Sequence, residues 1–105
     1  MITKSVDAQA KEFKGVSFDV LAVGEKSMIT KMNYKQGDYA STHSHPNEQS
    51  GYVISGKYNI VIGDDEALIT SGDSYVIPEN VPHSVTVIEE GIIIDVFTPV
   101  RKDYL

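Results

Sequence analysis

The segment GDYASTHSHPNEQSGYVISG, residues 37–56, places two histidines between two glycines and leads into an apolar run. His43 and His45 are two residues apart, and side chains at positions i and i+2 of an extended chain point to the same face. Both imidazoles can therefore converge on one point. Neutral imidazole is the commonest protein ligand of first-row transition metals, so this spacing predicts half of a metal site.

A second segment, GDSYVIPENVPH at residues 72–83, ends on the third and last histidine of the chain, His83. We expect it to join the first two as a ligand. Glu48 and Gln49 compete for a fourth ligand position beside the histidine pair. Because neighbouring residues of a strand point to opposite faces, only one of these two should face the metal.

Short β-branched and aromatic runs recur between turn signals along the whole chain, whereas a 3.6-residue apolar period is absent except for a single helical turn around residues 6–13. Evenly spaced short strands without intervening helices predict an antiparallel barrel or a double-sheet jelly roll, in one domain of residues 1–105. Inward side chains at its open end are the natural site. The predicted strands are residues 16–23, 27–34, 51–54, 57–62, 66–70, 74–77, 84–88 and 92–98.

The two histidine segments resemble the motifs of the cupin superfamily. The first motif runs Gly, five residues, His-x-His, three or four residues, Glu, six residues, Gly, and matches residues 37–56; the second, with Gly, five residues, Pro and a later His, matches residues 72–87. This resemblance implies an all-β cupin jelly-roll β-barrel, also called a double-stranded β-helix. Gln49 stands where the motif usually has glutamate. A neutral amide there would leave the metal more electron-poor, which suits a Lewis acid.

The last strand and the tail, DVFTPVRKDYL at residues 95–105, place a carboxylate inside an apolar strand. Asp95 shares one face of that strand with Ile93 and Phe97. If this face lines the barrel, burial raises the pKa of Asp95 while a nearby arginine or metal lowers it, and either environment marks a candidate acid or base. If the face is outward, Asp95 is simply solvated.

This ending, together with both motifs, is similar to the pectin-degradation cupins of the KdgF family. The resemblance implies metal-dependent ring opening of 4,5-unsaturated monouronates, small anionic sugar acids released from pectin or alginate, to linear keto-deoxyuronates. It also implies one divalent metal ion, Zn, Ni, Mn or Fe, with Asp95 as the acid or base and Arg101 as the substrate-binding residue. The implied metal ligands are His43, His45, Gln49 and His83.

Alternative functions remain open at this point. Three histidines with an open coordination position can also bind oxygen at Fe(II), which would make the protein a dioxygenase. A small cupin can also bind a sugar without catalysis, because fold does not imply activity. Four tyrosines in or beside the predicted strands are candidates for lining a sugar pocket, although aromatic strand residues more often pack in the core: Tyr39, Tyr52, Tyr58 and Tyr75.

Charge and composition limit the classes of partner that we expect the protein to bind. Nine basic and fifteen acidic residues give a formal net charge of -6, which opposes binding to nucleic acid. No apolar run approaches the roughly 20 residues that cross a bilayer, so no membrane partner is expected. The absence of cysteine and of an apolar secretory signal predicts a cytoplasmic protein. Sheet edges that need covering predict a homodimer.

Overall fold

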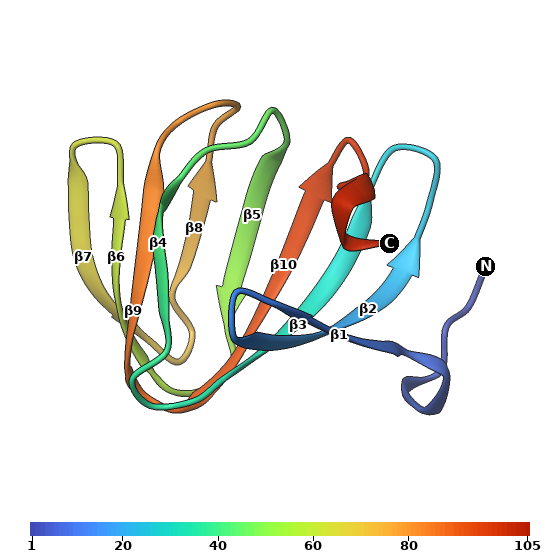
Figure 1. Cartoon of the computed structure of the whole chain (residues 1–105), viewed down its shortest axis with the longest axis horizontal. Coiled ribbons are helices and arrows are strands. Elements are labelled where there is room, and N and C mark those ends of the chain that lie inside the picture. Colours follow the sequence, from blue (N-terminus) through green and yellow to red (C-terminus); the bar gives the residue numbers. More distant parts are fainter.

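Two antiparallel sheets face each other in the computed structural model, which describes all residues 1–105 (Figure 1). The six-stranded sheet has the order β1-β2-β3-β10-β5-β8, and the four-stranded sheet has the order β4-β9-β6-β7. The elements are η1 (Ser5–Asp7), β1 (Gln9–Phe13), β2 (Val16–Val23), β3 (Met28–Tyr34), β4 (Tyr39–His43), β5 (Glu48–Val53), β6 (Lys57–Ile62), β7 (Asp65–Thr70), β8 (Ser74–Ile77), β9 (His83–Glu89), β10 (Gly91–Thr98) and η2 (Lys102–Tyr104).

The predicted all-β jelly roll is confirmed, and the eight predicted strands correspond to β2, β3 and β5 to β10. The structure adds two strands, β1 and β4, that the sequence did not indicate. The helical turn expected around residues 6–13 is wrong for most of that range, because only Ser5–Asp7 is helical while Gln9–Phe13 pairs with β2. No helix of the chain has the length and apolar character needed to span a membrane.

Alternating burial along the strands builds the core between the sheets. In β3 every second residue is buried, from Met28 through Tyr34, and β2 follows the same pattern over its first five residues. The two faces of each strand therefore differ in polarity, which is the period expected of a half-buried strand. The largest side chains with less than 2% exposure are Tyr58, Phe18, Phe97, Met28, Ile77, Ile93 and Val53.

Strand β10 lies between β3 and β5, and its register with β5 decides which side chains face inward. Phe97 is paired with Gln49, and Asp95 is paired with Gly51. Ile93, Asp95 and Phe97 are each at most 1% exposed. A slip of one residue would turn this whole inward set to solvent, so the register is fixed by the core that it buries.

One end of the sandwich collects the ends of four strands. There β4 and β10 finish while β5 and β9 begin, at the upper edge of the molecule in Figure 1. The C-terminal turn η2 follows β10 at the same edge (Figure 1). Residues far apart in the sequence thus meet at this end.

Candidate active site

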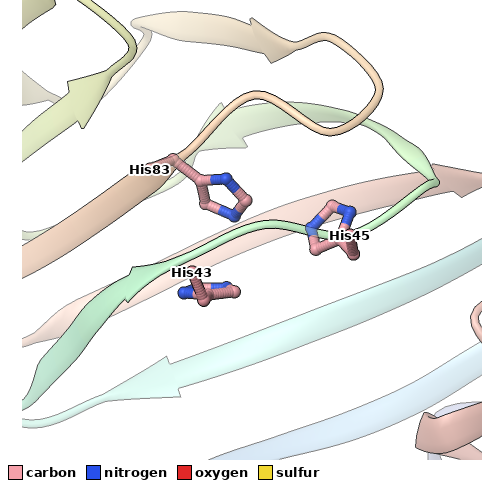
Figure 2. Close-up of side chains that lie close together, drawn as sticks. All are labelled: His43, His45 and His83. Carbon is pink, nitrogen blue, oxygen red and sulfur yellow. The ribbon is translucent and has the colours of Figure 1, made fainter.

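The three histidines of the chain surround one small space at this end (Figure 2). His43 is the last residue of β4 and His83 the first of β9, and the two are paired across the strands. His45 lies two residues beyond β4, so the two rings of the first motif do not share a strand as the spacing suggested. One ligand atom from each ring lies within 4.8 Å of those of the others, a cluster that a single metal ion can join.

An irregularity in β4 aims His43 into the site. The pairing of β4 with β9 runs from Tyr39 with Thr86 to Ala40 with Val85, then shifts so that His43 rather than Thr42 faces His83. A bulge adds one residue to one strand and reverses the facing of the residues that follow. His43 therefore points inward, while Thr42 is exposed.

Backbone carbonyls orient all three imidazoles in the same way. The Nδ1 atoms of His43, His45 and His83 lie 2.7, 2.9 and 2.9 Å from the carbonyl oxygens of Ser41, Asn47 and Val81, respectively. A carbonyl oxygen only accepts, so each Nδ1 carries the proton and donates it, leaving the lone pair of each neutral ring on Nε2.

The free nitrogens of this cluster suit a metal ion. Nε2 of His83 is buried and has no hydrogen-bond partner, although buried polar atoms are nearly always satisfied. Burial, the largest effect, lowers the pKa of His83 to about 4, with the neighbouring His43 and His45 acting in the same direction. Burial also lowers the pKa of His45. Neutral rings with a free lone pair are the form that binds first-row metals.

Gln49 and Glu48 lie on opposite sides of β5. Gln49 is only 9% exposed, and its Oε1 lies 3.1 Å from Nε2 of His45, whereas Glu48 is exposed. With Nδ1 of His45 protonated, both of these atoms carry lone pairs, and two acceptors do not bond to each other. A cation shared by both atoms satisfies them, as does rotation of the amide so that its NH2 group donates.

Asp95 lies on the inner face of β10, not on its outer face. Its carboxylate is 1% exposed and accepts a hydrogen bond of 2.6 Å from the hydroxyl of Tyr75. Burial raises the pKa of Asp95 from 3.8 to about 6, although Tyr75, Gln49 and Arg101 oppose that rise. Burial also raises the pKa of Tyr75 well above 10.0, so this phenol stays protonated and donates.

Arg101 is a buried cation held among aromatic rings. Its side chain is 6% exposed, and the guanidinium carbon lies 4.0 Å from the ring centroid of Tyr104, 5.5 Å from that of Phe97 and 5.8 Å from that of Phe13. Nε donates to both carboxylate oxygens of Asp103 at 3.2 Å, and Nη1 donates to the hydroxyl of Tyr104 at 2.8 Å. Such contacts fix the plane of the guanidinium group.

One cavity joins these groups. Its walls include His43, His83, Gln49, Asp95 and Arg101. Of the four candidate tyrosines, Tyr39 lines the cavity and Tyr75 does not, whereas Tyr58 is in the core and Tyr52 lies exposed on the outer face.

Two residues that line or support the site were missed in the sequence. Lys14, at the tip of the β1–β2 hairpin, lines the cavity mouth and is its second cation. Asn47 donates from Nδ2 to the carbonyl of Pro99 at 2.7 Å and so ties the loop of His45 to the tail that carries Arg101. The position of Asn47 between ligand candidates in the sequence could have indicated its place in the site. No sequence feature indicated that Lys14 lines the cavity.

Comparison with known proteins shows the family to which the chain belongs. The family model described as the cupin domain matches residues 30–97. The chain belongs to the cupin family. This cupin is 29% identical over 93 residues to the pectin degradation protein KdgF of Dickeya dadantii (strain 3937). The aligned residues cover 87% of this chain and 84% of that relative.

Two solved structures share the fold of this cupin over nearly its whole length. An RmlC-like cupin from Shewanella frigidimarina has a TM-score of 0.92 at 25% identity and covers 99% of this chain and 95% of its own. KdgF from Halomonas sp. has a TM-score of 0.91 at 22% identity and covers 100% of both chains. At such identity the second likeness supports the fold alone.

Replacing His83 with alanine should abolish metal binding by this cupin. After loading with Ni²⁺ or Zn²⁺ and desalting, elemental analysis should find about one ion per wild-type chain and almost none in the variant. Added metal should raise the melting temperature of the wild type but not that of His83→Ala. The exposed neighbour variant Thr42→Ala should keep both responses. A metal-loaded His83→Ala chain would remove His83 from the centre.

Burial of Asp95 should cost stability in the metal-free protein. Because the folded-state pKa of about 6 lies above 3.8, the wild type is stabilised by protonation at low pH and loses that stability as the pH rises through 6. Asp95→Asn removes this loss. In chelator, its free energy of unfolding relative to wild type should increase by about 2 kcal/mol between pH 4 and pH 7.5, measured by urea titration. Asp64→Asn, at an exposed turn, should show no such increase; equal pH profiles for Asp95→Asn and wild type would contradict the burial argument.

Proposed function

We propose that this cupin catalyses the metal-dependent ring opening of 4,5-unsaturated monouronates to linear keto-deoxyuronates. The observation that carries the proposal is a buried acid, Asp95, with a pKa of about 6, in a cavity whose walls also include Arg101 and two imidazoles of the three-histidine cluster. A pure binding protein has no need for such an acid. The similarity to a pectin degradation protein supports a sugar acid as the substrate.

The reaction is an isomerisation that needs proton transfer and no oxidant. The anomeric hydroxyl loses its proton, the bond between C1 and the ring oxygen breaks, and C1 becomes an aldehyde. The former ring oxygen is left on C5 as an enol. Addition of a proton to C4 and loss of the enol proton give the C5 ketone. One group that first takes and then returns a proton can serve both steps.

Asp95 fits that proton-transfer role. A carboxyl group with a pKa of about 6 is largely ionised at pH 7 but remains a useful acid, so it can accept a proton and donate it again. Its inward position in β10 directs it to the cavity, and burial excludes competing water. We assign the proton exchange between the anomeric oxygen and C4 to Asp95.

The other residues bind and orient the substrate. His43, His45, His83 and Gln49 would hold one divalent metal ion, which when bound supplies Lewis-acid polarisation of substrate oxygens. Arg101 would donate to the substrate carboxylate with its remaining N–H groups, because Asp103 and Tyr104 already orient its guanidinium. Imidazole and amide ligands are compatible with Zn, Ni, Mn or Fe, and the reaction requires no redox change.

Loss of the ultraviolet absorbance of an unsaturated monouronate tests the proposal directly. Metal-loaded wild type should accelerate the decay above its spontaneous rate. Asp95→Asn should lower kcat by about 100-fold or more with unchanged metal content, because the amide cannot exchange the proton. Asp64→Asn should be fully active. Full activity of Asp95→Asn would remove Asp95 from the chemistry.

The same preparation separates the rival functions. A dioxygenase would consume oxygen when loaded with Fe(II) and given substrate, whereas ring opening leaves the oxygen concentration unchanged. A binding protein would retain the sugar acid in calorimetry without changing its spectrum. A wild-type rate no higher than the spontaneous one would therefore overturn the proposed activity.

We propose further that two copies pair through the outer face of the six-stranded sheet. Val76 and Val96 lie on either side of Ser50 on that face and are 51% and 37% exposed, and the adjacent Tyr52 is 50% exposed. Apolar side chains grouped on an exposed sheet face favour association. Light scattering should give twice the chain mass of 11.5 kDa, and Val76→Lys should give the single mass. Leu68→Lys, on exposed β7, should leave the pair intact; a monomeric wild type would contradict the proposal.

A further inference from the structure

Tyr75, Gly51 and Asp95 form a row across three neighbouring strands. Gly51 of β5 is paired with Tyr75 of β8 on one side and with Asp95 of β10 on the other. Residues paired across strands point to the same face, and Asp95 shows that this face is the inner one. The tyrosine and the acid are therefore two strands apart with only a glycine between them.

The missing side chain of Gly51 lets Tyr75 reach the acid. A Cβ atom built on Gly51 would fall far inside van der Waals contact with Cζ, Cε1 and the hydroxyl oxygen of Tyr75. The phenol ring thus lies directly over the glycine backbone. Gly51 is not among the glycines with positive φ, so space rather than backbone conformation requires glycine there.

The contact that this gap permits is specific to one oxygen. The hydroxyl of Tyr75 lies 2.6 Å from Oδ1 of Asp95, a short hydrogen bond typical of a charged acceptor. With Oδ1 engaged by the phenol, Oδ2 is the oxygen left for proton exchange. A carboxylate free to rotate about its side-chain bonds would present this oxygen only part of the time.

We propose that Tyr75 is a positioning residue for Asp95. Gly51 has no side chain and so leaves the space in which the Tyr75 ring reaches the Asp95 carboxylate. The inference rests on the proposed function, in which Asp95 exchanges the proton. Tyr75 holds the carboxylate in one orientation at the cavity wall, and Gly51 keeps the path between the two side chains open. Neither residue needs to touch the substrate.

Tyr75→Phe removes only the hydroxyl and keeps the ring in place. We expect kcat for ring opening to fall about 10- to 100-fold, while KM and metal content stay within twofold of wild type, because substrate binding does not use this contact. Gly51→Ala should give a similar fall by displacing the ring. The double variant should be no slower than either single variant, since both changes remove one interaction.

Tyr58→Phe is the matched control for loss of a buried phenol. Its hydroxyl donates to the carbonyl of Ser55 at 2.8 Å, away from Asp95, so the variant should lose stability but keep kcat. An unchanged kcat in Tyr75→Phe would overturn the inference. So would a double variant whose fall in kcat equals the product of the falls in Tyr75→Phe and Gly51→Ala. A slow Tyr58→Phe chain would show that general destabilisation causes the loss.

Crystal structures of the wild type and Tyr75→Phe keep this inference separate from the proposed activity. The Asp95 carboxylate should occupy one orientation in the wild type and turn away from it, or divide between two, in the variant. The same single orientation in both would overturn the positioning role. If the wild type does not open the ring, the proposed function fails, and these structures still decide whether Tyr75 orients Asp95.

Discussion

Antiparallel pairing of β10 with β5 places Asp95 and Gln49 on the inside of the sandwich. The register that sets Phe97 beside Gln49 also sets Asp95 beside Gly51, and apolar burial of Ile93 and Phe97 holds it. Because side chains alternate, one register carries an amide and a carboxylate inward together with the core. The same alternation leaves Glu48 in solvent. Asp95, which would be costly to bury alone, is thus held in place by the hydrophobic Ile93 and Phe97 on either side of it along β10.

The histidines depend on backbone irregularity rather than on strand alternation. A bulge in β4 turns His43 inward, and the loop that follows places His45, whose carbonyl accepts from the backbone N–H of Asn80 at 2.8 Å. Carbonyl oxygens then fix the protonated nitrogen of each ring, so the three free nitrogens share one space before any ion is present. This arrangement has an energetic cost, because Nε2 of His83 is buried without a hydrogen-bond partner.

Sequence patterns predicted every strand that has a buried residue and failed for the two strands, β1 and β4, that have none. β2, β3 and β6 alternate cleanly and were found, whereas β4 has no buried residue because its inner side chains line the cavity. β1 is an edge strand without alternation and was taken for a helical turn. Spacing indicated that the histidines belong together but could not reveal the bulge, and Tyr75 looked like any core aromatic until the register placed it beside Gly51.

The C-terminal tail shows why the site needs the whole fold. Arg101 lies after the last strand, yet it is buried because its backbone N–H is directed at the sulfur of Met28 and its guanidinium stacks against Tyr104. Asn47 links the tail to the histidine loop through Pro99, and its own carbonyl accepts from Nδ1 of His45. One asparagine therefore contacts both halves of the site. Arg101 and the ring of His45 are therefore held in place through a shared residue rather than independently.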